Sequence, residues 1–353
     1  MDASTPTMLD VELRIGDDAQ ETQVDVLTYE EWGAPHLTYD EYLDREDQFR
    51  ATPFADDAVT DYVLVPTSDP STLDLRGYLE VFKRPVVLRP WSPSADLVYL
   101  DGWSVASVYT PARHRKKGYA SAMLAAFLGQ KKDAYTVVNL YSDIGTSFYA
   151  ARGWVLAPSL EISLPATTPA STRLPVGWTL RPLATPADLE AIATHDQERV
   201  AGRLQPGELA FLLSADAVTF FHVQHAYFAR KHLTLSTLPT TFGVVLQDDK
   251  AILGYVVWAH NFEENQLDIL KYDGSTPEVF AACLPTLHEE AARWNLENIV
   301  LWPTDEMALP NEVRALATPR SDSLSMVLVR TSKDSERELP PYTWVANEKY
   351  LYA

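Results

Sequence analysis

Apolar and polar residues follow two periods along the chain, and their order predicts both strands and helices. In the first half, short apolar and alternating stretches predict strands at 11–15, 61–66, 77–85, 103–109 and 135–141. Apolar residues three to four apart predict a central helix from Gly118 to about Lys132 and a short helix at 145–152 that ends at Gly153. Thr38 and Glu41 form a capping-box pattern, which predicts another helix start. Strands that frame a central helix in this order favour an α+β fold with a mixed sheet.

The pattern starts again in the second half. Four prolines between Pro158 and Pro175 predict an edge strand followed by a linker. Beyond them we predict a strand at 178–181, helices at 186–200, 209–227 and 277–296, and strands at 242–246, 252–260, 266–270, 298–302, 324–329 and 342–350. The sequence therefore predicts tandem domains of one fold, each a mixed, mostly antiparallel sheet flanked by helices. Their expected boundaries are 1–157 and 177–353, with a linker at 158–176.

Composition narrows the class of protein. A length of 353 residues suits two domains, and 46% hydrophobic with 11% aromatic residues is typical of a globular protein. The net charge of −20 argues against nucleic acid as a partner, because phosphate backbones bind basic surfaces. A single cysteine, Cys283, excludes an internal disulfide and favours a reducing compartment, so a cytoplasmic location is expected. Neither a signal-peptide pattern nor an apolar run of about 18 residues is present, so no membrane segment is expected.

Basic residues gather between a predicted strand and a predicted helix. Positions 113–117 read Arg-His-Arg-Lys-Lys in an otherwise acidic chain, directly before the helix that begins near Gly118. The first amides of a helix lack partners within it and carry partial positive charge, and a glycine lets an anion approach the backbone. This segment therefore predicts a polyphosphate site. A P-loop and a Rossmann fingerprint are excluded, because their Gly-Lys-Ser/Thr and additional glycines are missing.

Two motifs resemble the GNAT superfamily of N-acetyltransferases. Arg115-Lys116-Lys117-Gly118-Tyr119-Ala120 is similar to the acetyl-CoA loop of that superfamily, and SDIGTSFYAARGW at 142–154 resembles its second motif. Both stand in the order of the superfamily, with one predicted helix and one predicted strand between them. Together, SVYTPARHRKKGYAS and LYSDIGTSFYAARGW look like the fungal lysine N6-acetyltransferase group. The resemblance covers about the middle fifth of the chain and, more loosely, its N-terminal half.

The resemblance implies acetyl-CoA as cosubstrate. Backbone groups at the end of the strand 103–109 would pair with the pantetheine, and the basic turn would hold the pyrophosphate. The implied cofactor-binding residues are Val108, Tyr109, Thr110, Arg115, Lys116, Lys117, Gly118, Tyr119, Ala120 and Ser121. At the corresponding place the second half reads Lys271 to Thr276, where Asp273 would repel a pyrophosphate. We therefore expect the second half to hold no cofactor and to close the acceptor site.

The resemblance also implies an acid, whereas the base stays open. Tyr149 matches the tyrosine of the second motif, whose hydroxyl would protonate the departing CoA thiolate; alternatively it is a core residue packed with Phe148 and Trp154. A lysine amine, with a pKa of about 10.4, loses a proton before attack. Many superfamily members use a glutamate on the strand that is here 103–109, and this strand has none. The candidate bases are Asp143, which is alternatively a helix N-cap, and Asp101, His260 and Asp268, and a relay of water molecules would also serve. Asp101 and His260 are also the candidate substrate-binding residues.

We expect no metal site, because His222 and His225 lie three apart on a predicted helix without a third ligand. The expected reaction is direct acetyl transfer to a small cationic amine, since the first half has no cysteine for an acyl-enzyme. The resemblance implies the side-chain amine of lysine as acceptor, and a polyamine, a protein lysine or the amine of a secondary metabolite would also suit the motifs. A non-catalytic acetyl-CoA-binding protein or an acyl-thioester decarboxylase would carry the same acetyl-CoA loop. The oligomeric state stays open.

Overall fold

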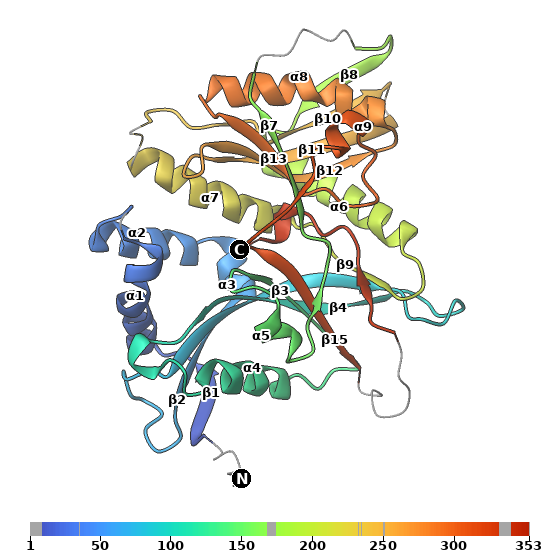
Figure 1. The fold of residues 1–353 in the computed structure, drawn as a ribbon. Helices are drawn as coiled ribbons and strands as arrows, with labels where there is room; N and C mark the ends of the chain where they lie inside the picture. The colour runs from blue at the N-terminus through green and yellow to red at the C-terminus, as the bar shows by residue number, and fades with distance from the viewer. Residues whose placement is uncertain are drawn as a thin grey trace. The chain divides into compact units, whose positions relative to one another are not determined.

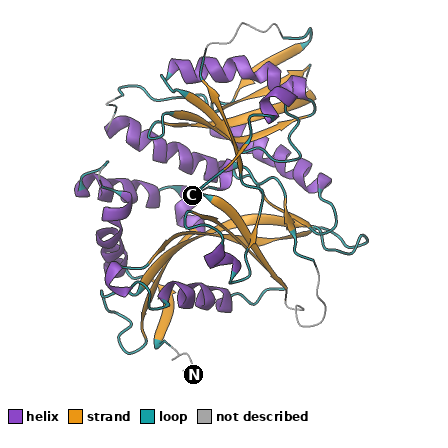
Figure 2. Ribbon diagram, viewed as in Figure 1, coloured by secondary structure: helices purple, strands orange, loops and turns teal. Residues whose placement is uncertain are grey.

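The computed structural model describes residues 9–34, 36–167, 174–231, 233, 235–249, 251–331 and 340–352, and these form two compact units. The first unit comprises the described residues among 9–83, 103–139 and 329–331, and the second those among 84–102, 140–328 and 340–352. The chain passes between the units inside β3 (Gly77–Leu88), β4 (Val98–Tyr109), β5 (Tyr135–Ser142) and β15 (Leu324–Thr331). The predicted fold class is confirmed, because mostly antiparallel sheets are flanked by helices (Figure 1, Figure 2). The domain boundaries predicted from the sequence stay a prediction.

The first unit is built on strands in the order β1-β2-β3-β4-β5. The first two, β1 (Val11–Ile15) and β2 (Val59–Pro66), form an antiparallel meander with the start of β3. The helices of this unit are α1 (Asp18–Trp32), α2 (Tyr39–Arg50), α3 (Pro53–Ala58) and α4 (Tyr119–Gln130). Strand β4 leads through a 3-10 turn at Ala112–His114 into α4, whose buried face carries Met123, Leu124, Phe127 and Leu128. The predicted succession of strand, basic turn and helix is confirmed.

Hydrophobic periodicity does not predict helix α1, because the buried face of this helix is polar. Gln20, Asp25 and Thr28 are buried there beside Val24. Hydrogen bonds stabilise that face instead: Gln20 Nε2 donates to the carbonyl oxygens of Pro70 and Thr72 at 3.0 and 3.1 Å. A capping box with Asp17 as N-cap begins the helix.

The second unit contains a seven-stranded sheet in the order β14-β7-β13-β12-β11-β10-β8, in which β12 and β13 pair in parallel and the neighbours on either side pair antiparallel. Its strands are β7 (Leu160–Pro165), β8 (Trp178–Pro182), β10 (Gly243–Asp248), β11 (Ala251–Asn261), β12 (Gln266–Gly274), β13 (Asn298–Leu301) and β14 (Thr318–Pro319). The longer helices are α6 (Pro186–Arg203), α7 (Ala215–Lys231) and α8 (Pro277–Arg293). The shorter elements are α5 (Ser147–Ala150), β6 (Val155–Leu156), α9 (Asn311–Arg314) and a 3-10 turn at Lys349–Leu351. Trp258, Phe280 and Leu287 are among the buried residues of its core.

Three predicted elements of this unit differ from the structure. The helix predicted at 209–227 is wrong at its start, because Glu208–Phe211 forms strand β9 and α7 begins at Ala215; an apolar run such as Leu209–Leu213 fits either structure. The strand predicted at 342–350 is limited to β16 (Thr343–Trp344), which pairs with β9. The predicted edge strand, β7, lies between β14 and β13. Residues 168–173 of the predicted linker lie outside the described residues.

Within the described residues, no helix is both long and apolar enough to cross a membrane.

Candidate functional site

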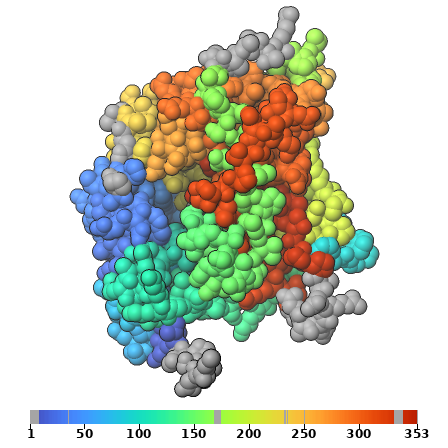
Figure 3. Space-filling view, viewed as in Figure 1, coloured from blue at the N-terminus to red at the C-terminus, as the bar shows by residue number. Residues whose placement is uncertain are grey.

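The turn before helix α4 has a backbone suited to bind an anion. Lys116 and Gly118 adopt left-handed conformations, with φ of 64° and 87°. Gly118 is the N-cap of α4, and no side chain caps the helix there. Among the described residues, a Cβ built on Gly118 would meet Leu9 Cδ1 at 3.7 Å, so the backbone conformation, rather than crowding, requires the glycine. The first amides of α4 are therefore uncapped by any side chain and follow a turn that is uncrowded at Gly118. This segment is coloured teal and lies at the surface in Figure 3.

The arginines and the lysines of the turn have different interactions. Arg113 pairs with Asp74 at 2.8 Å, and Arg115 pairs with Glu31 at 2.6 Å. Arg115 Nε also donates to the carbonyl oxygen of Thr110 at 3.0 Å, and Lys117 Nζ donates to the carbonyl oxygen of Arg113 at 2.9 Å. The arginines therefore shape the turn, whereas the exposed Lys116 and Lys117 supply positive charge at its surface.

Asp74 anchors this turn from the connection between β2 and β3. Hydrogen bonds from Arg76 and His114, with Arg113 beside them, hold the pKa of Asp74 well below its usual range. His114 Nε2 lies 2.8 Å from Asp74 Oδ1. Because Asp74 stays ionised, it keeps its ion pair with Arg113 of the turn at physiological pH.

The end of β4 leaves the regular strand conformation where the pantetheine was predicted to bind. Ser107 has φ of 50°, which is left-handed and unusual for a residue other than glycine within a strand. Val108, Tyr109 and Thr110 follow it and are half-buried. Thr110 Oγ1 is buried without a hydrogen-bond partner among the described residues. An irregular backbone and an orphaned hydroxyl at this point fit a polar ligand that supplies the missing partner.

Glu80 is a residue of this site that the sequence reasoning missed. It lies on β3, half-buried, and accepts a hydrogen bond from the Ser107 hydroxyl. Its direct cross-strand partner on β2 is Asp61, which accepts a hydrogen bond from the Tyr78 hydroxyl at 2.9 Å. Burial, and next the negative charge of Asp61, raise the pKa of Glu80 to about 8. A carboxylate with a pKa near the working pH is suited to general base catalysis.

Further carboxylates act on Glu80 and Asp61. Burial raises the pKa of Glu21, Glu46 and Asp61, and the charges of Asp61 and Glu46 each raise that of Glu80. The charge of Arg50, which donates hydrogen bonds to Asp25 at 2.7 and 3.2 Å, offsets part of the rise in pKa for Glu21, Glu46 and Asp61. A group of carboxylates that are costly to ionise together attracts a cationic ligand.

Tyr149 lies in the second unit and is 6% exposed. Its ring packs against Phe148 and Trp154, with centroids 5.0 and 6.0 Å away, as the core alternative predicted. Burial, and next the charge of Asp143, raise the pKa of Tyr149 to about 12. Tyr149 is therefore a weaker acid than an ordinary phenol, and its predicted catalytic role stays a prediction.

Asp143 is not the N-cap of the short helix that follows it, because α5 begins at Ser147 with Thr146 as N-cap. Asp143 Oδ1 instead accepts hydrogen bonds from the amide and hydroxyl of Ser323, at 2.9 and 3.3 Å. Ser323 has φ of 47°, so Asp143 stabilises a strained turn.

The remaining three acceptor-site candidates also lie in the second unit. Asp101 is exposed on β4. Asp268 pairs with Lys349 at 2.6 Å and accepts hydrogen bonds from Asn261 and Gln266. His260 is buried, with Nε2 at 2.9 Å from Glu290 Oε1, and burial lowers its pKa. The structure thus brings together 107–121 and Glu80 in the first unit, whereas Asp101, Asp143, Tyr149 and His260 belong to the second.

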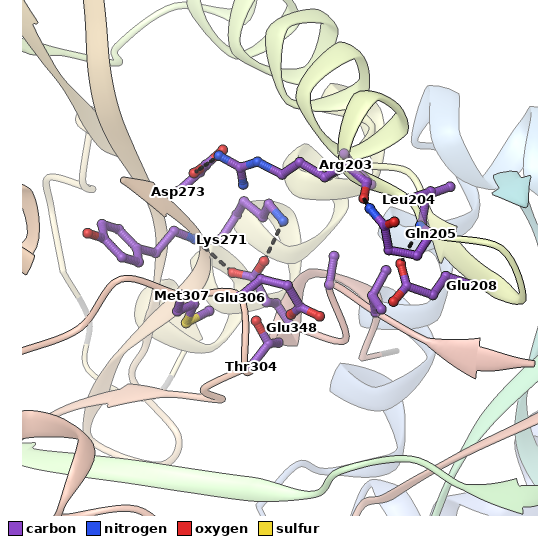
Figure 4. Close-up of a pocket in the computed structure, with 14 residues that line it drawn as sticks. Arg203, Leu204, Gln205, Glu208, Lys271, Asp273, Thr304, Glu306, Met307 and Glu348 are labelled. Atoms are coloured by element: carbon purple, nitrogen blue, oxygen red, sulfur yellow. Dashed lines mark hydrogen bonds and ion pairs between the residues drawn. The ribbon is translucent and has the colours of Figure 1, made fainter. Parts of the chain in front are cut away.

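A cavity of about 200 Å³ in the second unit is lined by the end of α6 at Arg203, by Lys271 to Asp273 of β12, and by Met307 and Glu348 (Figure 4). The β12 residues of this lining belong to the segment that corresponds to the basic turn. The buried charged groups of the cavity form ion pairs. Lys271 Nζ contacts Glu348 and lies 3.3 Å from Asp196. Asp273 pairs with Arg199 at 2.6 Å and with Arg203 at 3.1 Å. These mutual pairs explain how buried charges are tolerated there, and they support no ligand assignment.

Among the described residues, no group of three or more His, Cys, Asp or Glu side chains could hold a metal ion.

Comparison with known proteins gives one family match. Residues 161–353, more than half of the chain, match the family described as the LYC1 GNAT-like C-terminal domain. No curated protein matches the sequence.

Solved structures with a similar fold include three from bacteria. A GCN5-related N-acetyltransferase from Anabaena variabilis ATCC 29413 is 12% identical with a TM-score of 0.56, over 90% of this chain and 72% of that chain. A probable N-acyltransferase from Enterococcus faecalis V583 is 13% identical with a TM-score of 0.54, over the same shares. A GCN5-related N-acetyltransferase from Kribbella flavida is 13% identical with a TM-score of 0.52, over 93% and 72%. At these identities the likeness shows the fold alone, and the predicted GNAT-type fold is confirmed.

Proposed function

Because the chain belongs to the family of LYC1 GNAT-like C-terminal domains, we propose that it transfers the acetyl group of acetyl-CoA directly to the side-chain amine of lysine. The family and the fold are those of N-acetyltransferases. One observation carries the proposal: in the first unit, Glu80 is hydrogen-bonded to Ser107, two residues before the β4 end that leads into the uncapped turn at Gly118. A carboxylate of raised pKa and an anion-binding turn flank the same strand end.

The turn and the strand end suit acetyl-CoA. The first amides of α4, with Lys116 and Lys117, would hold the pyrophosphate, and the half-buried backbone of Val108 to Thr110 would pair with the pantetheine. The Thr110 hydroxyl is a further available hydrogen-bonding group. Bound there, acetyl-CoA supplies the activated acyl group.

Glu80 is suited to accept the proton of the incoming ammonium. With a pKa of about 8, it takes the proton of an amine of pKa about 10.4 at a cost of about 2 pKa units. A carboxylate of ordinary pKa would face about 6 units. The neighbouring acidic groups Asp61 and Glu46 favour a cationic acceptor at the same place. The freed amine then attacks the thioester carbon, the carbon–sulfur bond breaks, and the nitrogen loses its second proton as the amide forms. The departing thiolate takes up one proton, which Tyr149 would supply in its predicted role.

Free-thiol release from acetyl-CoA tests the proposal with three amines: L-lysine, putrescine and a lysine-containing peptide. We expect release that depends on L-lysine. Release with putrescine or with the peptide instead would reject free lysine while keeping N-acetylation. Binding of acetyl-CoA without release in the presence of any of the three would contradict acetyl transfer to these amine classes.

Replacing Tyr149 by Phe tests the acid. If its hydroxyl protonates the thiolate, kcat falls about tenfold or more while the affinity for acetyl-CoA stays unchanged, because only the reacting proton is removed. Tyr141→Phe is the matched control, since Tyr141 also has a buried hydroxyl in the second unit, with no hydrogen-bond partner among the described residues. Equal kcat values for the two variants would assign Tyr149 to the core alone.

We also propose a cytoplasmic location, because the one cysteine, Cys283, is a free thiol, which suits a reducing compartment.

A further inference from the structure

A second cavity of the second unit, of about 190 Å³, lies between helix α7 and the end of strand β11. Among its lining residues are three imidazoles, two aromatic rings and one guanidinium: His222, His225, His260, Phe242, Phe262 and Arg230. Typical pockets for cofactors and drug-sized ligands measure about 300–1,000 Å³, so this cavity suits a smaller molecule.

The hydrogen bonds of His260 define what its free nitrogen can do. Glu290 is ionised, because hydrogen bonds from His260 and Trp294 outweigh burial and lower the pKa of its carboxyl. A carboxylate only accepts, so the proton of the neutral imidazole sits on Nε2, which lies 2.9 Å from Glu290 Oε1. His260 Nδ1 is then an acceptor. It is buried, in a side chain 3% exposed, and it has no hydrogen-bond partner among the described residues.

His222 is fixed in the same tautomer. Its Nε2 lies 3.0 Å from the carbonyl oxygen of Trp258, which also only accepts, so Nε2 carries the proton and Nδ1 is an acceptor. Burial lowers the pKa of His222 to about 3, so the ring is neutral at physiological pH. Its face stacks on Phe242 with centroids 3.8 Å apart. The cavity therefore offers imidazole acceptors between aromatic faces, a setting that favours an ammonium group.

Arg230 adds the opposite charge. It lies exposed in the last turn of α7, and it is the permanently charged residue among the described residues of the lining. A simple amine would be repelled by this guanidinium, whereas a carboxylate would pair with it. The lining is thus complementary to a small molecule that carries both an ammonium and a carboxylate.

We propose that this cavity binds a free α-amino acid as its zwitterion. The α-ammonium donates to His260 Nδ1, the carboxylate pairs with Arg230, and an apolar side chain lies against Phe242 and Phe262. The ammonium keeps its proton, because the lowered pKa of His260 makes the imidazole a far weaker base than the amine. The site is one of recognition, and it does not depend on the acetyl transfer proposed above.

Calorimetric titration of the full chain with L-norleucine, without acetyl-CoA, tests this site. Norleucine has no side-chain amine, so it cannot be the proposed acetyl acceptor, and its binding is independent of that reaction. Hexanoate and pentylamine are the matched ligands that lack the ammonium and the carboxylate. We expect norleucine to bind about tenfold or more tightly than either, since each missing group leaves a partner unsatisfied.

Two variants locate the binding. His260→Phe keeps the ring and removes the acceptor, and Arg230→Gln removes the charge at an exposed position where folding is unaffected; each is expected to weaken norleucine binding about tenfold. His288→Phe is the control, because His288 is also a buried histidine of the second unit and does not line the cavity. Failure of the wild type to bind norleucine at millimolar concentration, or equal affinity in Arg230→Gln and wild type, would overturn the proposal.

Discussion

Glu80→Gln is expected to lower kcat with L-lysine by about a hundredfold or more, because general base catalysis contributes about 10²–10⁴. Glutamine keeps the shape and can still accept the hydrogen bond from Ser107, but it cannot take a proton. In the wild type, log(kcat/KM) should rise with pH up to about 8, where Glu80 becomes ionised, and then level off. That rising limb should be absent in the variant. If Tyr149 is the acid, its pKa of about 12 keeps it protonated throughout this range, so no falling limb is expected until the pH approaches about 12.

Stability separates this catalytic effect from misfolding. Because the folded state raises the pKa of Glu80 from 4.5 to about 8, its contribution to stability is present at low pH and is lost as the pH rises through about 8. Removing the charge should therefore leave the unfolding temperature at pH 8.5 unchanged or raise it. Glu12→Gln, at an exposed position on β1 of the same sheet, is the control and should retain full activity. An unchanged kcat in Glu80→Gln would remove Glu80 from the reaction.

Gly118→Asp is expected to weaken acetyl-CoA binding about a hundredfold or more in a folded protein. An added carboxylate at the N-cap of α4 would accept from the amides that the pyrophosphate needs, and it would repel the phosphates. Two charges about 4 Å apart interact by about 4 kcal/mol at an effective dielectric constant of about 20, which is enough for such a loss. Equilibrium binding of acetyl-CoA measures the effect.

Gly118→Asn isolates the charge in this experiment. Asparagine has the shape of aspartate and also tolerates the left-handed conformation at φ of 87°. Its affinity for acetyl-CoA should therefore lie between those of the wild type and Gly118→Asp. Equal affinities of the Asp variant and the wild type would show that the pyrophosphate binds elsewhere.

The proposed acetyl-CoA turn could be predicted from the sequence because its parts are local. Strand β4, the basic residues and Gly118 follow one another, and hydrophobic periodicity and a left-handed glycine position are properties of short segments. The pairing of the turn's arginines with Glu31 and Asp74 could not be predicted, because these partners lie far away in the chain.

Glu80 could not be identified in the same way. Both strands that carry Glu80 and Asp61 were predicted, but a one-residue shift in strand register moves every side chain to the opposite face. Only the observed register places these carboxylates opposite each other. Pairing with distant strands likewise makes the start of the apolar run Leu209–Leu213 a strand rather than a helix. Hydrogen bonds to a distant loop, such as that from Gln20 to Pro70, stabilise the polar face of α1. The pair of His260 and Glu290 joins a strand to a helix, and no local pattern indicates it.

Lysine acetylation by the first unit can be tested directly by NMR analysis of the products formed from acetyl-CoA and L-lysine. We expect N6-acetyl-lysine and free CoA in equal amounts from the wild type, and about a hundredfold slower formation of both by Glu80→Gln. Consumption of acetyl-CoA without an acetylated amine, or equal rates of product formation by the two proteins, would refute the proposed reaction.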